Sequence, residues 1–183
     1  MIQLEDIPAL VENIKGYLAN ILALLPEKAE VAALNFINDK LDTLTTAPEL
    51  PATILAGGCY REMFYGCSSL TTAPTLPATT IAQECYSHMF INCSSLTTAP
   101  ELPATTLVDD CYSAMFQSCE SLKTAPELPA TKIPQRSYTS MFSFCTSLVN
   151  VPELPITSLD TYSCSSMFYG CTSLITAPEL PAT

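Results

Sequence analysis

The stretch Leu96–Ser121 reads L-T-T-A-P-E-L-P-A-T-T-L-V-D-D-C-Y-S-A-M-F-Q-S-C-E-S, and it recurs along the chain every 26 residues. Five full copies and ten residues of a sixth begin at Leu44, Leu70, Leu96, Leu122, Leu148 and Leu174. No residue is inserted or lost between copies. A register without slips is typical of a repeat protein in which each copy forms one rung stacked on the next. We therefore number positions within a copy from 1 (the leucine) to 26 (the last serine).

The second half of each copy contains the pattern C-Y-x-x-M-F-x-x-C. In the second copy this pattern places Cys85, Met89 and Cys93 at i, i+4 and i+8, with Tyr86 and Phe90 beside them. Apolar residues at this spacing share one face of a helix. The pattern predicts a short helix whose apolar face points into the core.

The first half of each copy carries proline at two fixed positions, such as Pro74 and Pro77. Proline has no backbone donor, so a parallel strand here is confined to about three residues around Leu-Thr-Thr-Ala. The following P-E-L-P-A-T predicts an extended corner. The expected fold is an α/β repeat solenoid with short parallel strands on one side and short helices on the other.

The segment Met63 to Pro74, M-F-Y-G-C-S-S-L-T-T-A-P, resembles the bacterial BspA-like leucine-rich repeat, whose units carry a similar A-F-x-G-C-x-S-L core. The A-P-E-L-P-A-T phrasing is similar to repeats of gut Bacteroidales surface proteins and their phages. The resemblance covers Leu44 to Thr183, about three quarters of the chain. This unit is longer than the common form and has a second proline. The resemblance implies a leucine-rich-repeat solenoid used for adhesion or recognition at a cell surface or on a virion.

Residues 1–43 form a separate predicted unit, ahead of a repeat domain over residues 44–183. Leu4, Val11, Leu18 and Leu25 recur every seven residues, and Pro26 divides two amphipathic helices that predict an antiparallel hairpin. One interpretation is a cap over the first rung. The other is a coiled-coil seam that makes a homo-oligomer through residues 4–25.

The composition excludes several partners. The net charge is −11, which argues against binding to nucleic acid or to an anionic membrane surface. The longest apolar stretch, Gly16 to Pro26, is too short to cross a bilayer, so no membrane insertion is expected. The first twelve residues carry Glu5, Asp6 and Glu12 and no positive charge, which predicts no signal peptide.

The cysteines form two columns that invite a disulfide or metal interpretation. The first column comprises Cys59, Cys85 and Cys111. The second column comprises Cys67, Cys93, Cys119, Cys145 and Cys171. Their eight-residue spacing lacks the C-x-x-C pairs of zinc sites, and serine replaces cysteine at 137 and 163. Buried thiols are the favoured interpretation, and no metal or cofactor is expected.

No pattern in the chain predicts catalysis. The lone His88 has no plausible nucleophile partner, and no Gly-rich phosphate loop or H-E-x-x-H occurs. A row of carboxylates repeats at one position, interrupted by Thr75, and nothing distinguishes one from the next: Glu49, Glu101, Glu127, Glu153 and Glu179. The row could bind cations loosely or repel a neighbouring acidic surface. We interpret the row as a solvated edge. The protein is not expected to be an enzyme.

Candidate partner-binding residues come from positions that vary between copies, just before the first cysteine column and on the outward side of the predicted helices. They are Tyr65, Gln83, Glu84, Asp109, Asp110, Gln135, Arg136 and Tyr169. Tyrosine is enriched at interfaces, which favours Tyr65 and Tyr169 as anchors. The alternative surface is the uniform threonine ladder, which suits a periodic partner such as a polysaccharide or another copy of the same array.

These observations favour a non-enzymatic adhesion or recognition module that binds a protein or polysaccharide ligand. The second hypothesis is a structural assembly component, such as a phage virion fibre or decoration protein, oligomerised or anchored through the N-terminal helices.

Overall fold

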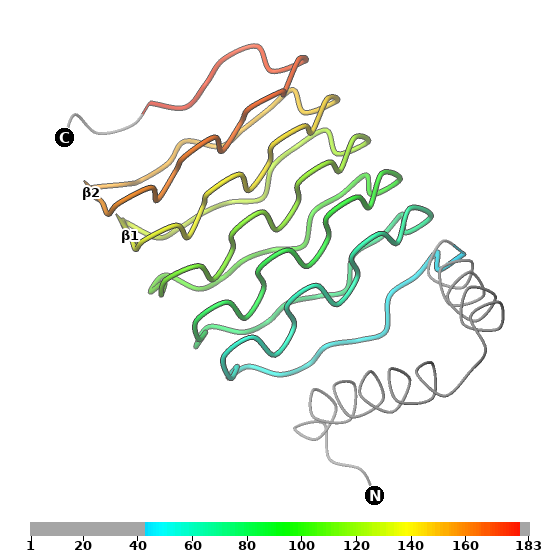
Figure 1. Ribbon diagram of the computed structural model, residues 1–183, viewed down its shortest axis with the longest axis horizontal. Helices are drawn as coiled ribbons and strands as arrows, with labels where there is room; N and C mark the ends of the chain where they lie inside the picture. Colours follow the sequence, from blue (N-terminus) through cyan, green and yellow to red (C-terminus); the bar gives the residue numbers. More distant parts are fainter. Residues whose placement is uncertain (1–42, 180–183) are drawn as a thin grey trace, which may run out of the picture.

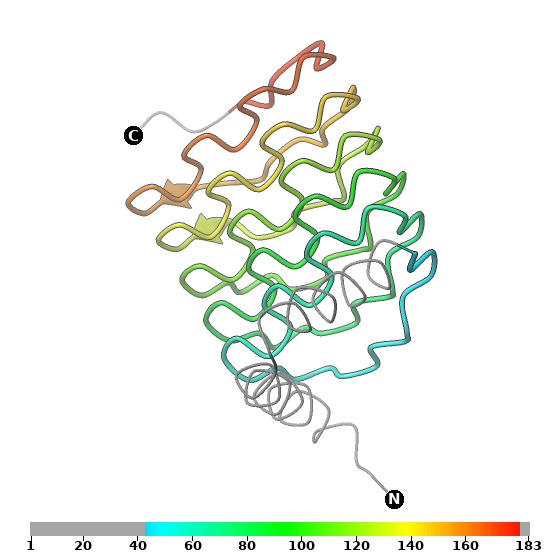
Figure 2. The same cartoon turned by 45° about the vertical axis from the view of Figure 1, so that its right-hand side comes forward.

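The computed structural model describes residues 43–179, which form a stack of rungs that rises regularly from the first copy to the last (Figure 1). The rungs are residues 44–69, 70–95, 96–121, 122–147 and 148–173. One side of every rung follows a zigzag path, which is also visible in the turned view (Figure 2). The repeat fold expected from the sequence is therefore present. The predicted helical hairpin of residues 1–43 falls almost wholly outside the described residues.

Parallel pairing joins neighbouring rungs at a register of one repeat. Strand β1 (Lys132–Ile133) pairs with β2 (Ser158–Leu159), with Lys132 opposite Ser158. Single parallel bridges at position 3 join Thr46 to Thr72, Thr72 to Thr98, and Thr124 to Asn150. The Leu-Thr-Thr-Ala segment therefore pairs as predicted, but through isolated bridges. The two-residue strands lie at positions 11 and 12, directly after the P-E-L-P-A-T segment, where the sequence predicted no strand.

The prediction of a short helix in the second half of each rung is wrong. No helix occurs among residues 43–179, and positions 14–25 form overlapping reverse turns. Met63 N donates to Tyr60 O at 3.3 Å within the rung, whereas Phe64 N donates to Met89 O of the next rung at 3.0 Å. This alternation continues along the segment. The turns repeat every four residues, so i, i+4 and i+8 share one side as they do on a helix.

The turns require positive φ at positions 15, 19 and 23 of every rung. Glycine, asparagine, aspartate and serine hold many of these positions, and such residues are poor helix formers. The non-glycine examples are Glu62, Glu84, His88, Asn92, Asp110, Ala114, Ser118, Arg136, Ser140, Phe144, Tyr162 and Ser166. Helical hydrogen bonding to residue i−4 is replaced here by bonds to the neighbouring rung, which stacking makes available.

The core consists of columns of identical side chains, as the sequence predicted. Phenylalanines stack through five rungs, with ring centroids 5.5–5.7 Å apart. A parallel tyrosine column runs from Tyr60 to Tyr138. The methionine column beside them is fully buried at Met89, Met115 and Met141. Each rung therefore buries its apolar surface only against its neighbours.

The cysteines occupy the core as thiols, and all nine lie within the described residues. In the second column the thiols of Cys93, Cys119, Cys145 and Cys171 each donate to a phenylalanine carbonyl of the preceding rung. Cys93 Sγ lies 3.1 Å from Phe64 O, and Cys119 Sγ lies 3.2 Å from Phe90 O. Burial raises the pKa of the Cys93 thiol to about 12. These thiols contribute to packing and to the bonds between rungs.

Candidate functional site

Six of the predicted partner-binding residues lie together on the zigzag side, which we call the turn face (positions 14–25 of each rung). Gln83, Asp109 and Gln135 share position 14 in three successive rungs. Glu84, Asp110 and Arg136 follow at position 15, where every residue has positive φ. The repeat therefore brings these side chains into two adjacent columns.

Hydrogen bonds and ion pairs link the members of these columns to each other. Arg136 Nε and a terminal guanidinium nitrogen each lie 2.8 Å from a carboxylate oxygen of Asp110, which is only 9% exposed. This bidentate contact raises the pKa of Arg136. Gln135 N donates to Asp109 Oδ1 at 3.2 Å. Arg61 also pairs with Glu84. Because their partners are already in place, these side chains form a fixed polar surface.

The two tyrosines predicted as anchors are not brought together. Tyr65 and Tyr169 share position 22 but belong to the first and fifth rungs. At roughly 5 Å per rung they lie about 20 Å apart. Both are exposed, whereas Ile91 and Ser143 at the same position are 7% and 3% exposed. Position 22 as a whole is therefore not outward, contrary to prediction.

His88 has a neighbour that the sequence argument did not identify. Its Nδ1 lies 2.6 Å from Ser87 Oγ. Burial lowers the pKa of His88, as does the charge of Arg61, against opposing effects from nearby carboxylates. Ser87 is only 2% exposed, so its hydroxyl is closed to a substrate. The contact is a local structural one rather than a nucleophile and base.

The opposite side of the stack carries the threonine ladder, whose hydroxyl donors are partly used between rungs. Thr71 Oγ1 lies 3.3 Å from Thr45 O, and Thr97 Oγ1 lies 3.3 Å from Thr71 O. These hydroxyls keep acceptor capacity and their methyl groups for a partner. The described members of the glutamate row are all exposed, as expected for a solvated edge.

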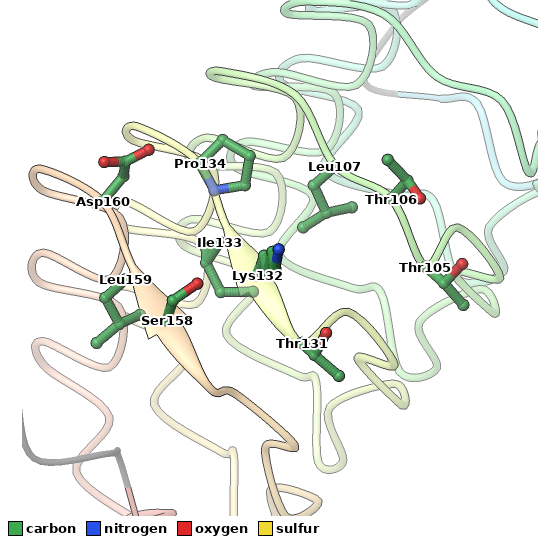
Figure 3. A pocket seen from close by; sticks show the side chains of 10 residues that line it. All are labelled: Thr105, Thr106, Leu107, Thr131, Lys132, Ile133, Pro134, Ser158, Leu159 and Asp160. Atoms are coloured by element: carbon green, nitrogen blue, oxygen red, sulfur yellow. The ribbon is translucent and has the colours of Figure 1, made fainter.

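A groove of about 480 Å³ lies between these two sides, at positions 10–13 of the third to fifth rungs (Figure 3). The Lys132 ammonium and the Asp160 carboxylate line it together with hydroxyls from Thr105, Thr131 and Ser158. This combination can form hydrogen bonds with a hydroxyl-rich ligand. The groove was not predicted from the sequence, because its lining comes from three segments that lie 26 residues apart and meet only when the rungs stack.

Metal binding has no support among the described residues, where no group of three or more potential ligands comes together. Burial raises the pKa of Cys85 and Cys145 to about 12 and that of Cys111 to about 11, so these thiols are protonated at neutral pH. A protonated thiol is a poor metal ligand. Within residues 43–179 no helix has the length and apolar character that crossing a membrane requires.

Comparisons with known proteins identify no matching protein-family model and no matching curated protein. A similar solved structure is the crystal structure of a leucine rich cell surface protein from Faecalibacterium prausnitzii A2-165. The two sequences are 22% identical, and the TM-score is 0.32. The match covers 68% of this chain and 28% of that chain, so this chain matches little more than a quarter of that protein.

Proposed function

We propose that this chain is a non-enzymatic recognition module of the leucine-rich-repeat kind, related to BspA-like repeats, that binds a protein or glycan partner at a cell surface or on a virion. One observation carries the proposal. Most side chains that change from rung to rung are at least partly exposed on the turn face, as at Gln83, Asp109 and Arg136, while the buried columns stay nearly constant. A constant scaffold with a varied surface is the arrangement that recognition by repeat proteins uses.

The turn face is the preferred binding surface. Its exposed tyrosines and ordered charged side chains offer both apolar contact and directional hydrogen bonds. The threonine ladder and the groove beside Lys132 form the second candidate surface, suited to a hydroxyl-rich polymer.

Binding of the full chain to a glycan array and to a panel of purified extracellular-matrix proteins tests the proposal. Two matched variants then locate the surface. The first is the double variant Tyr65→Ser with Asp109→Asn, which changes the turn face. The second is the double variant Thr72→Val with Thr98→Val, which changes the ladder without changing side-chain shape. We expect the first variant to lose binding and the second to keep it. The reverse result would assign recognition to the ladder.

A structural assembly component, such as a phage virion fibre or decoration protein, is the second candidate function. It rests on the heptad of Leu4, Val11, Leu18 and Leu25, which lies outside the described residues. Absence of any binding in both screens, together with an oligomer that deletion of residues 1–42 abolishes, would favour this candidate.

A further inference from the structure

Charge is distributed unevenly along the turn face. Its first three rungs carry Arg61, Glu62, Glu84, Asp109, Asp110 and Glu120. By contrast, residues 137–152 and 161–178 contain no charged side chain at all. We call the turn-face residues 137–146 and 161–172 the neutral face. It is rich in serine and threonine hydroxyls, in a chain whose net charge is −11.

The neutral face carries aromatic rings that are too exposed to be explained as part of the core. Phe144 is 44% exposed and Tyr169 is 64% exposed. Phe144 also has φ 61°, at a position where other rungs carry Gly66, Asn92 and Ser118. A left-handed conformation is unfavourable for a bulky residue. The turn requires positive φ at this position in every rung, so the observation that points to a contact outside the monomer is the half-exposed phenyl ring.

The two rings are held in a defined arrangement. Phe144 and Tyr169 meet edge to face with centroids 5.3 Å apart, and Phe144 N donates to Tyr169 O at 2.7 Å. Gly170 leaves space for the phenyl ring, because a Cβ there would lie 2.7 Å from Phe144 Cδ1. The pair forms a fixed aromatic ridge, and such rigid anchors lose little entropy on association.

We propose that the neutral face is a self-association surface through which two copies of this chain pack in an isologous dimer centred on Phe144 and Tyr169. Two molecules with a charge of −11 repel each other wherever their carboxylates approach within a Debye length. The neutral face lets two copies meet without opposing any carboxylates. A twofold axis places the same aromatic ridge on both sides of the contact, where depletion of charge and enrichment of aromatic residues are typical of interface cores.

Such a dimer would bury Tyr169, so recognition by the turn face would then fall to its first three rungs. The proposal rests on observations other than those that carry the recognition function. It also differs from association through residues 4–25, because its determinants lie in the fourth and fifth rungs. A dimer of this kind would double the number of recognition surfaces presented to a repetitive partner.

Sedimentation equilibrium of the full chain over a wide concentration range tests the proposal. We expect a mass that rises with concentration from the 19.7 kDa monomer toward the dimer. Phe144→Ser should weaken association at least about tenfold, as expected for a central anchor. This variant should fold, because Ser118 occupies the same position in the third rung. Ser165→Glu should weaken association as well, and added salt should partly restore it.

Tyr65→Ser is the matched control. It removes a tyrosine from the same position as Tyr169, but on a rung that carries charged side chains. This variant should leave association unchanged. A chain that stays monomeric at every concentration would overturn the proposal. So would an oligomer that Phe144→Ser leaves intact. A monomeric chain that loses binding to a glycan or protein on Phe144→Ser would assign the neutral face to that ligand instead and would leave the recognition function standing.

Discussion

The two halves of each rung hold to their neighbours in different ways. In the turn half, alternate backbone donors bind carbonyls of the next rung, as Tyr86 N does with Cys111 O at 3.1 Å. In the proline-containing half, pairing is reduced to isolated bridges such as Thr72 with Thr98 and to the two-residue pair of β1 with β2. The turn half is nevertheless the one whose surface varies between copies. A ladder of backbone bonds over buried columns leaves outward side chains free to change, because it does not depend on them.

The largest expected difference between the two halves is their response to high pH, because the buried titrating thiols belong to the turn half. Burial raises the pKa of Cys85, Cys93 and Cys145 from 9.0 to about 12. Since these pKa values are raised on folding, the stabilisation is complete below pH 9 and is lost as pH rises toward 12. We expect cooperative alkaline unfolding in this pH window. Circular dichroism measured as a function of pH would detect it.

Cys85→Ser is the matched variant for the alkaline transition. It removes one titrating thiol and copies Ser137, which holds the same position in the fourth rung. The midpoint of alkaline unfolding should move to higher pH. An unchanged midpoint in this variant would show that thiol ionisation does not drive the transition.

Removing one ring from the phenylalanine stack should be the most damaging single substitution. Phe116 is fully buried between Phe90 and Phe142, and its ring centroid lies 5.5 Å from the ring centroid of each. Phe116→Ala should lower the free energy of unfolding in urea by about 3–5 kcal/mol. Thr105→Ala, on the exposed surface of the other half, should change it by less than about 0.5 kcal/mol. Equal losses in the two variants would contradict the difference drawn between the halves.

The adjacent glycines Gly57 and Gly58 test the positive φ that the turns require. Gly58 has φ +63° with open space around an added Cβ, so Gly58→Ala should cost about 1 kcal/mol through backbone strain alone. Gly57 is not at positive φ, and its added Cβ would make an ordinary 3.5 Å contact with Gln83 O. Gly57→Ala should be neutral or stabilising by up to about 1 kcal/mol. Thermal unfolding of both variants measures the difference, and equal effects would rule out the turn geometry.

The smallest expected effect concerns the tyrosine column. Tyr112 Oη is buried and has no hydrogen-bond partner among the described residues. Tyr112→Phe removes an unsatisfied polar group and should stabilise the protein by about 1 kcal/mol in urea unfolding. Tyr86→Phe, one rung away in the same stack, should gain less, since the Tyr86 hydroxyl is not orphaned in this way. A loss of stability in Tyr112→Phe would indicate that the hydroxyl has a partner in solution.

Much of the candidate site could be anticipated from the repeat alone. Residues 26 apart lie in adjacent rungs, so the spacing placed Asp110 and Arg136 side by side at position 15, but the ion pair between them was not predicted from the sequence. That spacing could not reveal that Ile91 and Ser143 are buried, because their exposure depends on the turn geometry. It also could not reveal the contact between Ser87 and His88, which depends on local side-chain direction.

By itself, the sequence determined the length of the repeat, the stacking of one copy on the next, and the inward columns of cysteine, tyrosine, methionine and phenylalanine. These follow from which residues are apolar and from a register without insertions. Only the tertiary structure decided between helix and turn. Both conformations place i, i+4 and i+8 on one side, and they differ in where the backbone N–H of a residue such as Phe64 finds its acceptor. That acceptor, Met89 O, lies in another rung and exists only once the rungs have stacked.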